Sequence, residues 1–207
     1  MKIAIDVDDC ISNTSEVDFA TCWLFNQQLN PNDNKLYYNN YHNAPTIFGF
    51  DKETDDKFYE QQRKQVVREG LIYPKIFSDR VINKLLNEGH DITILTSRGD
   101  QYWGDALAET KKWLAKYNIH YTHCVANSGS KGEYCKANNI DVMLEDNPKY
   151  AKQVNDVGIR TILILAEYNK DYKNDLNTFA SCWPEVYKII NELNRKKIKN
   201  SDEQRLI

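Results

Sequence analysis

The sequence predicts an α/β fold in which a doubly wound parallel sheet carries a small helical unit inserted after its first strand. Short apolar segments alternate along the chain with amphipathic ones, a pattern typical of parallel strands joined by helical crossovers. About eighty residues separate the first apolar segment from the second, far more than one crossover needs. The length of 207 residues and the apolar content of 41% suit one core domain with an insertion.

The strands are expected where apolar and β-branched residues run together. The first is residues 2–8, KIAIDVD, and four more are expected at 90–97, 119–126, 140–146 and 159–165. Strands of a parallel sheet are covered on both faces, so they form nearly continuous hydrophobic runs, as these do.

Helices are expected between these strands, at 79–88, 104–117, 130–138 and 148–157. Gly89 and Gly158 stand where two of them should end, and Pro148 stands where one should begin. A C-terminal helix is expected at 184–197, and residues 199–207 are expected to fray. Right-handed crossovers then place helices on both faces of the sheet.

The long interval after the first strand is expected to form a helical subdomain above the exit of that strand. It contains helical patterns near 15–29 and 54–69 and is rich in Tyr, Asn and Asp. An unstructured loop of this length is uncommon inside a compact domain. We therefore divide the chain into a core of residues 1–14 and 79–198 and an insert of residues 15–78.

Composition argues against several classes of protein. The net charge of −3, without a basic stripe, argues against a nucleic-acid polymer as partner. No apolar run approaches the ~20 residues that cross a bilayer, and charge at Asp6 interrupts any signal peptide. Five cysteines without a CxxC pair indicate neither a disulfide framework nor a zinc site. These features predict a cytoplasmic protein; its oligomeric state is left open, with a homodimer as one candidate.

Polar side chains collect where the predicted strands end. Ligands of open α/β sheets bind outside the carboxyl ends of the strands, so these positions are the candidate site. The residues are Asp6, Asp8, Asp9, Thr96, Ser97, Arg98, Asn127, Ser128, Glu145, Asp146 and Asn147.

Five acids at one sheet edge repel one another strongly where water is scarce, so a compensating charge is expected. Carboxylate oxygens suit a hard divalent cation, and Mg²⁺ combines a few carboxylates with waters and a substrate phosphate. Any one of these aspartates alone is as well explained as a helix cap or turn residue. Their convergence from separate regions of the sequence favours a Mg²⁺ site.

Four motifs in order resemble those of the haloacid dehalogenase-like (HAD) superfamily of phosphohydrolases. They are DVDDC at 6–10, ILTSR at 94–98, Lys131, and EDNP at 145–148, and the resemblance spans roughly residues 2–165. It implies a Rossmann-like core, and the insert after the first motif is similar to the helical cap of one branch. The TSR and EDNP variants and the length most resemble 5′-nucleotidase-like proteins, including 5′(3′)-deoxyribonucleotidases.

The resemblance implies that Asp6 is the nucleophile of a phosphomonoesterase. A carboxylate attacks phosphorus and becomes an aspartyl-phosphate, which divides a difficult displacement into two steps. Asp8 lies two residues further on, on the same side if the chain is still extended. It is expected to protonate the leaving oxygen and then accept a proton from the hydrolytic water. The expected partner is a small phosphate monoester, preferably a nucleotide, with a sugar phosphate as the alternative.

The remaining motif residues are expected to hold the metal and the phosphoryl group. The resemblance implies that Asp6, the backbone carbonyl of Asp8, and Asp146 bind Mg²⁺, with Glu145 as a supporting or additional ligand. Thr96 and Lys131 are expected to donate to the phosphoryl oxygens, and Ser97 to line the same site.

Three residues leave their roles open. Asp9 and Cys10 stand where the family usually has Gly and then Thr or Val; Asp tolerates turn geometry, and Cys10 fits a packing role better than that of a thiol nucleophile. None of the four histidines is placed to activate that thiol or shows a metal-ligand pattern. Arg98 has two equal readings, a substrate clamp or an ion pair with Asp100 or Asp105.

Two other classes share parts of this pattern. A receiver-type phospho-acceptor domain also sets an acid pair after its first strand, but the insert and Lys131 argue against it. A catalytically inactive relative that binds a ligand is disfavoured by the intact set of motif residues. Turnover of a phosphate ester with Mg²⁺ separates the three.

Aromatic residues crowd one part of the insert: Tyr37, Tyr38, Tyr41, His42, Phe48 and Phe50. For any single ring, a place in the small core of the insert is the simpler interpretation. Their number, together with the resemblance, favours stacking of a nucleotide base on Tyr38, Tyr41 or Phe48.

Overall fold

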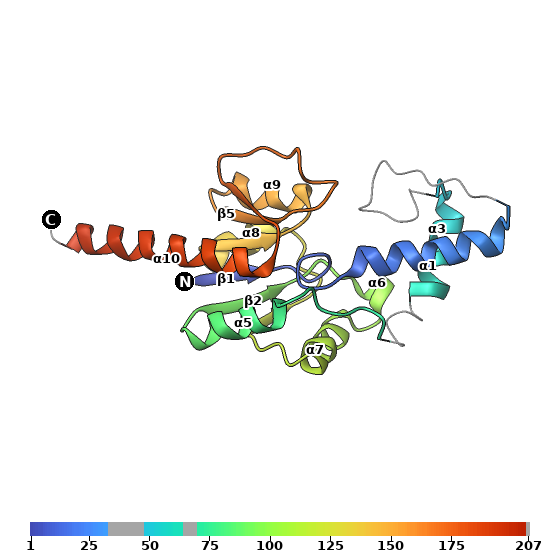
Figure 1. The fold of residues 1–207 in the computed structure, drawn as a ribbon, viewed down its shortest axis with the longest axis horizontal. Coiled ribbons are helices and arrows are strands. Elements are labelled where there is room, and N and C mark those ends of the chain that lie inside the picture. The colour runs from blue at the N-terminus through green and yellow to red at the C-terminus, as the bar shows by residue number, and fades with distance from the viewer. Residues whose placement is uncertain (33–47, 64–69, 206–207) are drawn as a thin grey trace.

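The computed structural model describes residues 1–32, 48–63 and 70–205, and its centre is a parallel sheet (Figure 1). The strand order is β3-β2-β1-β4-β5-β6. The strands are β1 (Lys2–Ile5), β2 (Asp91–Leu95), β3 (His123–Val125), β4 (Val142–Glu145), β5 (Arg160–Ile164) and β6 (Asn177–Ala180). The first five lie within the predicted ranges, and all neighbouring pairs are parallel, which confirms the predicted fold class.

The edge strand β6 was not predicted. It has four residues, NTFA, of which only Ala180 is buried, so it carries no hydrophobic run. Its pairing with β5 places Ile162 beside Thr178 and Ile164 beside Ala180. The sequence of β6 lacks the alternation of a half-buried strand, so pairing with β5 is what makes this segment a strand.

Helices cover both faces of the sheet (Figure 1). They are α5 (Ser78–Asn87), α6 (Asp100–Trp103), α7 (Ala106–Lys116), α8 (Lys131–Ala137), α9 (Pro148–Asp156) and α10 (Trp183–Arg205). Apolar residues of α5, α7 and α10 pack with Ile3 and Ile5, whereas α8 and α9 pack with Ala4 and Met143 on the other face. Alternate residues of β1 thus reach opposite faces, as a pleated strand requires.

Two helix boundaries of the core differ from the sequence prediction by more than one residue. The helix expected from residue 104 is α7 and begins at Ala106, because the Asp105 side chain accepts the N–H of Ala108 at 2.8 Å and caps it. The C-terminal helix continues to Arg205 instead of ending at 197. Residues 198–205 contain neither Gly nor Pro, and Lys199 lies 3.8 Å from Glu203 one turn away, so nothing local interrupts the helix.

The described part of the insert consists of α1 (Thr14–Leu29), α3 (Lys52–Phe58) and the π-helical turn η1 (Tyr59–Arg63). The helices α1 and α3 lie side by side at one end of the molecule, away from the sheet (Figure 1). Apolar side chains of these helices and of the turn before α3 form a cluster of their own, made of Cys22, Phe25, Phe48 and Phe58. The insert therefore has a small core separate from those of the sheet.

The two connections between insert and sheet lie next to each other. Ser12 pairs with Pro74 in an antiparallel bridge, and the N–H of Asn13 donates to the carbonyl of Tyr73 at 3.1 Å. In return, the N–H of Tyr73 donates to Oδ1 of Asn13 at 2.8 Å. These paired connections come soon after β1 in the chain. They therefore lie near the strand ends where the site was predicted. Among the described residues, no helix has the length and hydrophobicity to cross a membrane.

Candidate active site

The site is built at the carboxyl ends of β1 and β4, which are neighbours in the sheet. The chain passes from β1 to β2 on one side and from β4 to β5 on the other, so the connections diverge between β1 and β4. A crevice opens at such a switch point in doubly wound sheets. Asp6 follows β1 directly and continues its ladder, its N–H donating to the Leu144 carbonyl at 3.0 Å.

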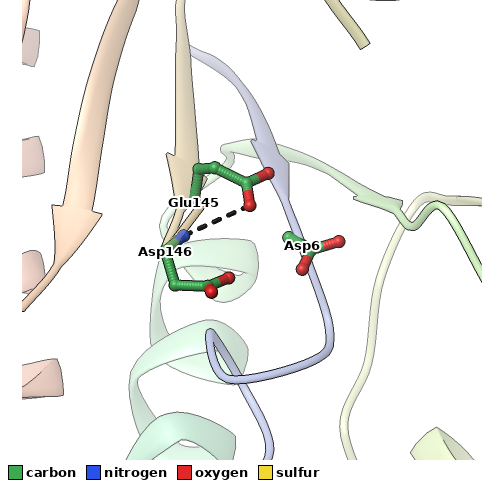
Figure 2. Close-up of side chains that lie close together, drawn as sticks. All are labelled: Asp6, Glu145 and Asp146. Atoms are coloured by element: carbon green, nitrogen blue, oxygen red, sulfur yellow. Dashed lines mark hydrogen bonds between the residues drawn. The ribbon is translucent and has the colours of Figure 1, made fainter. Parts of the chain in front are cut away.

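Three buried carboxylates meet here: Asp6, Glu145 and Asp146 (Figure 2). Each offers an oxygen atom that lies within 4.8 Å of the others. Glu145 Oε1 accepts the N–H groups of Asp146 and Asn147, at 3.3 and 3.1 Å, and this holds the turn after β4. The sequence prediction that acids from two strand ends converge is therefore correct.

Lys131 is the cation nearest to this acidic group. It begins α8, is almost fully buried, and its Nζ donates to Asp6 at 2.6 Å and to Glu145 at 2.7 Å. The Nζ atom also lies 4.4 Å from the ring centre of Tyr150. Lys131 thus reaches the acidic group from the first turn of a helix that precedes β4.

One lysine cannot balance three buried carboxylates. Burial raises the pKa of Asp6 to about 7; Lys131 acts against the rise, and the charges of Glu145 and Asp8 add to it. Burial, followed by the charges of Glu145 and Asp6, raises the pKa of Asp146 well above its usual value. Burial alone would lower the pKa of Lys131, but the two adjoining carboxylates outweigh it and raise that pKa. A cluster of hard oxygen donors with excess negative charge fits a divalent cation.

Asp8 faces the same pocket but is paired with Arg98. Nε of Arg98 donates to Oδ2 of Asp8 and Nη2 donates to Oδ1, both at 2.7 Å. The hydroxyl of Thr14, the first residue of α1, donates to Oδ1 at 2.6 Å. The predicted ion pair of Arg98 with Asp100 or Asp105 is wrong: Arg98 pairs with Asp8, while Asp100 and Asp105 accept the N–H groups of Ala106 and Ala108. Arg98 also lines the pocket, and contact with a substrate stays a prediction.

Asp9 occupies the left-handed region of the backbone, with φ of 60°. Its carboxylate accepts the N–H of Ser15 at 2.7 Å and the Ser15 hydroxyl, so it caps the first turn of α1. Burial raises the pKa of Asp9, and the bonds from Ser15 act in the opposite direction. An aspartate therefore replaces the glycine that the family pattern has here, because Asp tolerates this backbone conformation and also supplies the cap.

The hydroxyls predicted after β2 also face the site. Thr96 is buried and its Oγ1 accepts the N–H of Arg98 at 3.2 Å, and Ser97 Oγ lies 3.5 Å from Ser128 Oγ. Both residues line a pocket of about 310 Å³ together with the acidic group, Asp8 and Lys131. The structure therefore brings Asp6, Asp8, Thr96, Ser97, Arg98, Lys131, Glu145 and Asp146 to one cavity.

Residues 5–198 match the model of the family described as 5′ nucleotidase, deoxy (pyrimidine), cytosolic type C protein. The chain belongs to this nucleotidase family. It is therefore an enzyme of the phosphatase type with a HAD-like α/β fold.

One similar protein agrees with the family match, and two solved structures agree with the fold. A nucleotidase from Clostridium acetobutylicum is 25% identical over 198 residues, covering 95% of this chain and 96% of that protein. A haloacid dehalogenase-like hydrolase from Streptococcus pneumoniae superposes with a TM-score of 0.65 at 12% identity, covering 91% and 97% of the two chains. A HAD hydrolase from Bacillus subtilis, solved bound to magnesium, has a TM-score of 0.56 at 14% identity and covers 92% and 98%.

Of the three rings predicted to stack on a base, only Phe48 is among the described residues. Phe48 is buried in the core of the insert, 5.8 Å from the Phe19 ring and 5.9 Å from the Phe50 ring, and it is not among the described residues that line the pocket. Tyr38 and Tyr41 lie outside the described residues. For Phe48 the simpler interpretation, a packing role, fits the structure.

Three other rings do line the pocket, and sequence analysis missed them: Tyr59, Trp103 and Tyr150. Tyr59 begins η1 of the insert, and Trp103 ends the short helix α6. Tyr59 directly follows Phe58 and Trp103 directly follows Tyr102, whereas Tyr150 is a single ring among mostly polar residues, so no shared local pattern marks the three. The one sequence signal that could have identified Trp103 and Tyr150 is their closeness to the TSR and EDNP motifs.

Tyr168 and Asn169 also support the site without a sequence signal. Tyr168 Oη donates to Oδ2 of Asp146, and the Asn169 amide donates to the carbonyls of Asp146 and Ile164, at 2.7 and 2.8 Å. Burial and then the charge of Asp146 raise the pKa of Tyr168, so its hydroxyl stays protonated as a donor. These residues lie twenty-two and twenty-three positions from Asp146.

Cys10 is fully buried beneath the site. Burial raises the pKa of its thiol well above the usual value, and the charges of Asp6 and Asp146 add to the rise. Since the thiolate is the nucleophilic form, this environment disfavours covalent chemistry at Cys10.

Proposed function

We propose that this nucleotidase hydrolyses (deoxy)nucleoside 5′-monophosphates through an aspartyl-phosphate on Asp6, with Mg²⁺ as cofactor. The observation that carries the proposal is the buried group of Asp6, Glu145 and Asp146 with Lys131, set in one pocket with Asp8. Five free cysteines suit a reducing compartment, so we also propose a cytoplasmic location.

Asp6 and Asp146, with the backbone carbonyl of Asp8, would hold the metal. Glu145 is already engaged by Lys131 and by two backbone N–H groups, which supports a role in fixing Lys131 and the β4 turn. When bound, Mg²⁺ neutralises charge on the carboxylates and on the substrate phosphate.

The first chemical step forms one bond and breaks another. An Asp6 carboxylate oxygen attacks phosphorus, the bond from phosphorus to the ester oxygen breaks, and Asp8 gives its proton to that oxygen. Lys131 and the Thr96 hydroxyl, both at the pocket, donate to the phosphoryl oxygens as charge spreads over them.

The second step restores the enzyme. Water attacks the phosphorus of the aspartyl-phosphate, Asp8 accepts its proton, and the bond from phosphorus to the Asp6 oxygen breaks to release inorganic phosphate. Burial of Asp6 and its ion pair with Lys131 hold the attacking carboxylate in one orientation before the first step.

Aromatic surface in the pocket supports a nucleotide as the substrate. Tyr59 of the insert lines the cavity to which the sheet contributes the acidic group. A base stacked on one aromatic ring gains about 1–3 kcal/mol, which a sugar phosphate lacks. Base contacts by Tyr38 and Tyr41 remain part of this proposal.

A phosphate-release assay tests the proposal. Wild-type protein with Mg²⁺ is offered nucleoside monophosphates, sugar phosphates and p-nitrophenyl phosphate, with an Asp6→Asn variant as matched control. We expect nucleotides to have the highest kcat/KM, EDTA to abolish turnover, and Asp6→Asn to lose about 1,000-fold or more. If sugar phosphates exceed every nucleotide, the substrate assignment fails; if Asp6→Asn keeps a tenth of the activity, the covalent mechanism fails.

A further inference from the structure

The proposed reaction needs Asp8 aimed at the leaving oxygen, and the structure shows what aims it. The Asp8 side chain is 26% exposed, whereas the Arg98 side chain that pairs with it is 2% exposed. Asp8 is therefore the more accessible member of the pair, although both residues line the pocket. An arginine buried to this degree makes its contacts with the protein and presents little surface to a substrate.

The pairing fixes the orientation of the carboxylate as well as its position. Two parallel N–H donors, Nε and Nη2, each bond a different oxygen of Asp8 at 2.7 Å. Such a bidentate pair holds the plane of the carboxylate, which a lysine ammonium cannot do because it acts as a point charge. Thr14 adds a third donor on Oδ1, from the insert side.

Arg98 itself is held on its other sides. Its guanidinium carbon lies 3.9 Å from the ring centre of Trp103, and its Nη1 donates to the Thr110 hydroxyl of α7 at 3.4 Å. Trp103 ends α6, which lies against η1 of the insert. The guanidinium therefore has a stacking surface, a hydrogen-bond anchor and a carboxylate, which together leave it one orientation.

We infer that Arg98 is a positioning residue for Asp8 rather than a clamp for the substrate. This inference rests on the proposed function, because it assigns Asp8 the proton transfer. Its consequence is selective: loss of the bidentate pair misplaces a proton donor, so only substrates whose leaving oxygen needs a proton should suffer strongly.

The test compares two esters and reads kcat/KM, which reports the steps through the first release of product. A nucleoside monophosphate has an alkoxide leaving group that needs a proton, whereas p-nitrophenolate leaves without one. For Arg98→Lys we expect a loss of about 10- to 100-fold on the nucleotide, within the range of general acid catalysis. The loss on p-nitrophenyl phosphate should stay below about threefold, with the KM for the nucleotide changed by less than about twofold.

A double-mutant cycle identifies the partner of Arg98. In an Asp8→Asn background, Arg98→Lys should cause no further selective loss, because there is no proton donor left to misplace. Arg160→Lys is the matched control, since Arg160 is an exposed arginine at the start of β5 and should behave as wild type on both esters. Arg98→Met repeats the comparison with a side chain that cannot pair with Asp8, and thermal melting checks that it folds. The ratio of kcat/KM between the two esters does not depend on the fraction of protein that is folded.

Three outcomes would overturn the inference while the wild type remains active. These are equal losses on both esters, a raised KM with unchanged kcat, and a selective loss that persists in the Asp8→Asn background. In each case the proposed hydrolase function would stand. A wild type that turns over no phosphate ester with Mg²⁺ would instead remove the proposed function, and this inference with it.

Discussion

The charge on Asp6 is the clearest residue-scale property of the site. Its pKa is raised from 3.8 to about 7, so between these values the folded state binds a proton that the unfolded chain releases. Ionisation of Asp6 therefore opposes folding, and this cost develops as pH rises through that interval. A bound cation would remove the cost, which links the charge of one residue to the cofactor.

This linkage predicts the pH dependence of stability in metal-free protein. From pH 4 to 7, the free energy of unfolding of the wild type should fall relative to that of Asp6→Asn, which keeps the size of the side chain but cannot ionise. The measurement is urea unfolding of both proteins in EDTA at several pH values. If the free energies of unfolding of the two proteins change with pH in the same way, ionisation of Asp6 does not oppose folding.

At the scale of elements, the loop between β5 and β6 acts on the end of β4. Asn169 is fully buried, and its amide joins the carbonyls of Asp146 and Ile164, while its own Oδ1 accepts the N–H of Ala166 at 2.9 Å. Tyr168 beside it bonds the carboxylate of Asp146. The loop thus supports a residue that we propose as a metal ligand.

Substitutions of the two loop residues should have different effects, one on the affinity for Mg²⁺ and the other on the free energy of unfolding. Tyr168→Phe removes the hydroxyl that donates to the Asp146 carboxylate. It should weaken Mg²⁺ binding about 10- to 100-fold, with little change in the free energy of unfolding. Asn169→Ala removes three hydrogen bonds of a buried group and should cost about 2–4 kcal/mol of unfolding free energy. Isothermal titration with Mg²⁺ and urea unfolding measure the two effects. Unchanged Mg²⁺ affinity in Tyr168→Phe would show that Asp146 needs no such support.

At the scale of the whole molecule, the site lies between two separately packed parts. The sheet packs against helices on both of its faces, and the described part of the insert has its own cluster around Phe25 and Phe58. Asp8 and Asp9 accept hydrogen bonds from Thr14 and Ser15 at the start of α1, so the loop after β1 is tied to both parts. Folding of the sheet is therefore a condition for forming the acidic group.

A ligand that needs this assembled group should stabilise the folded protein. Mg²⁺ at 100 times its dissociation constant should add about 2.7 kcal/mol, a rise in Tm of roughly 5–10 °C for a chain of this size. Asp146→Asn removes one of the three carboxylates and should abolish most of the shift. Thermal melts of both proteins with and without Mg²⁺ provide the test, and an equal shift in the variant would place the ion elsewhere.

The sequence by itself determined the architecture and the place of the acidic group. Apolar runs of strand length, separated by helical patterns, have few solutions other than a parallel sheet. Parallel strands bring their carboxyl ends to one edge, so Asp6 and Asp146 had to approach each other despite their separation in sequence. The order of the motifs was enough to indicate the family that the whole-chain match then showed.

Only the tertiary structure decided the partners of these residues. Arg98 meets Asp8 ninety positions away, and Tyr168 meets Asp146 twenty-two positions away, through loops whose conformation follows no period. Phe48 faces the core of the insert, while Tyr59, which directly follows the core residue Phe58, lines the pocket. Periodicity specifies which face of a strand or helix is buried, but a side chain at a loop or turn is directed by whatever packs around it.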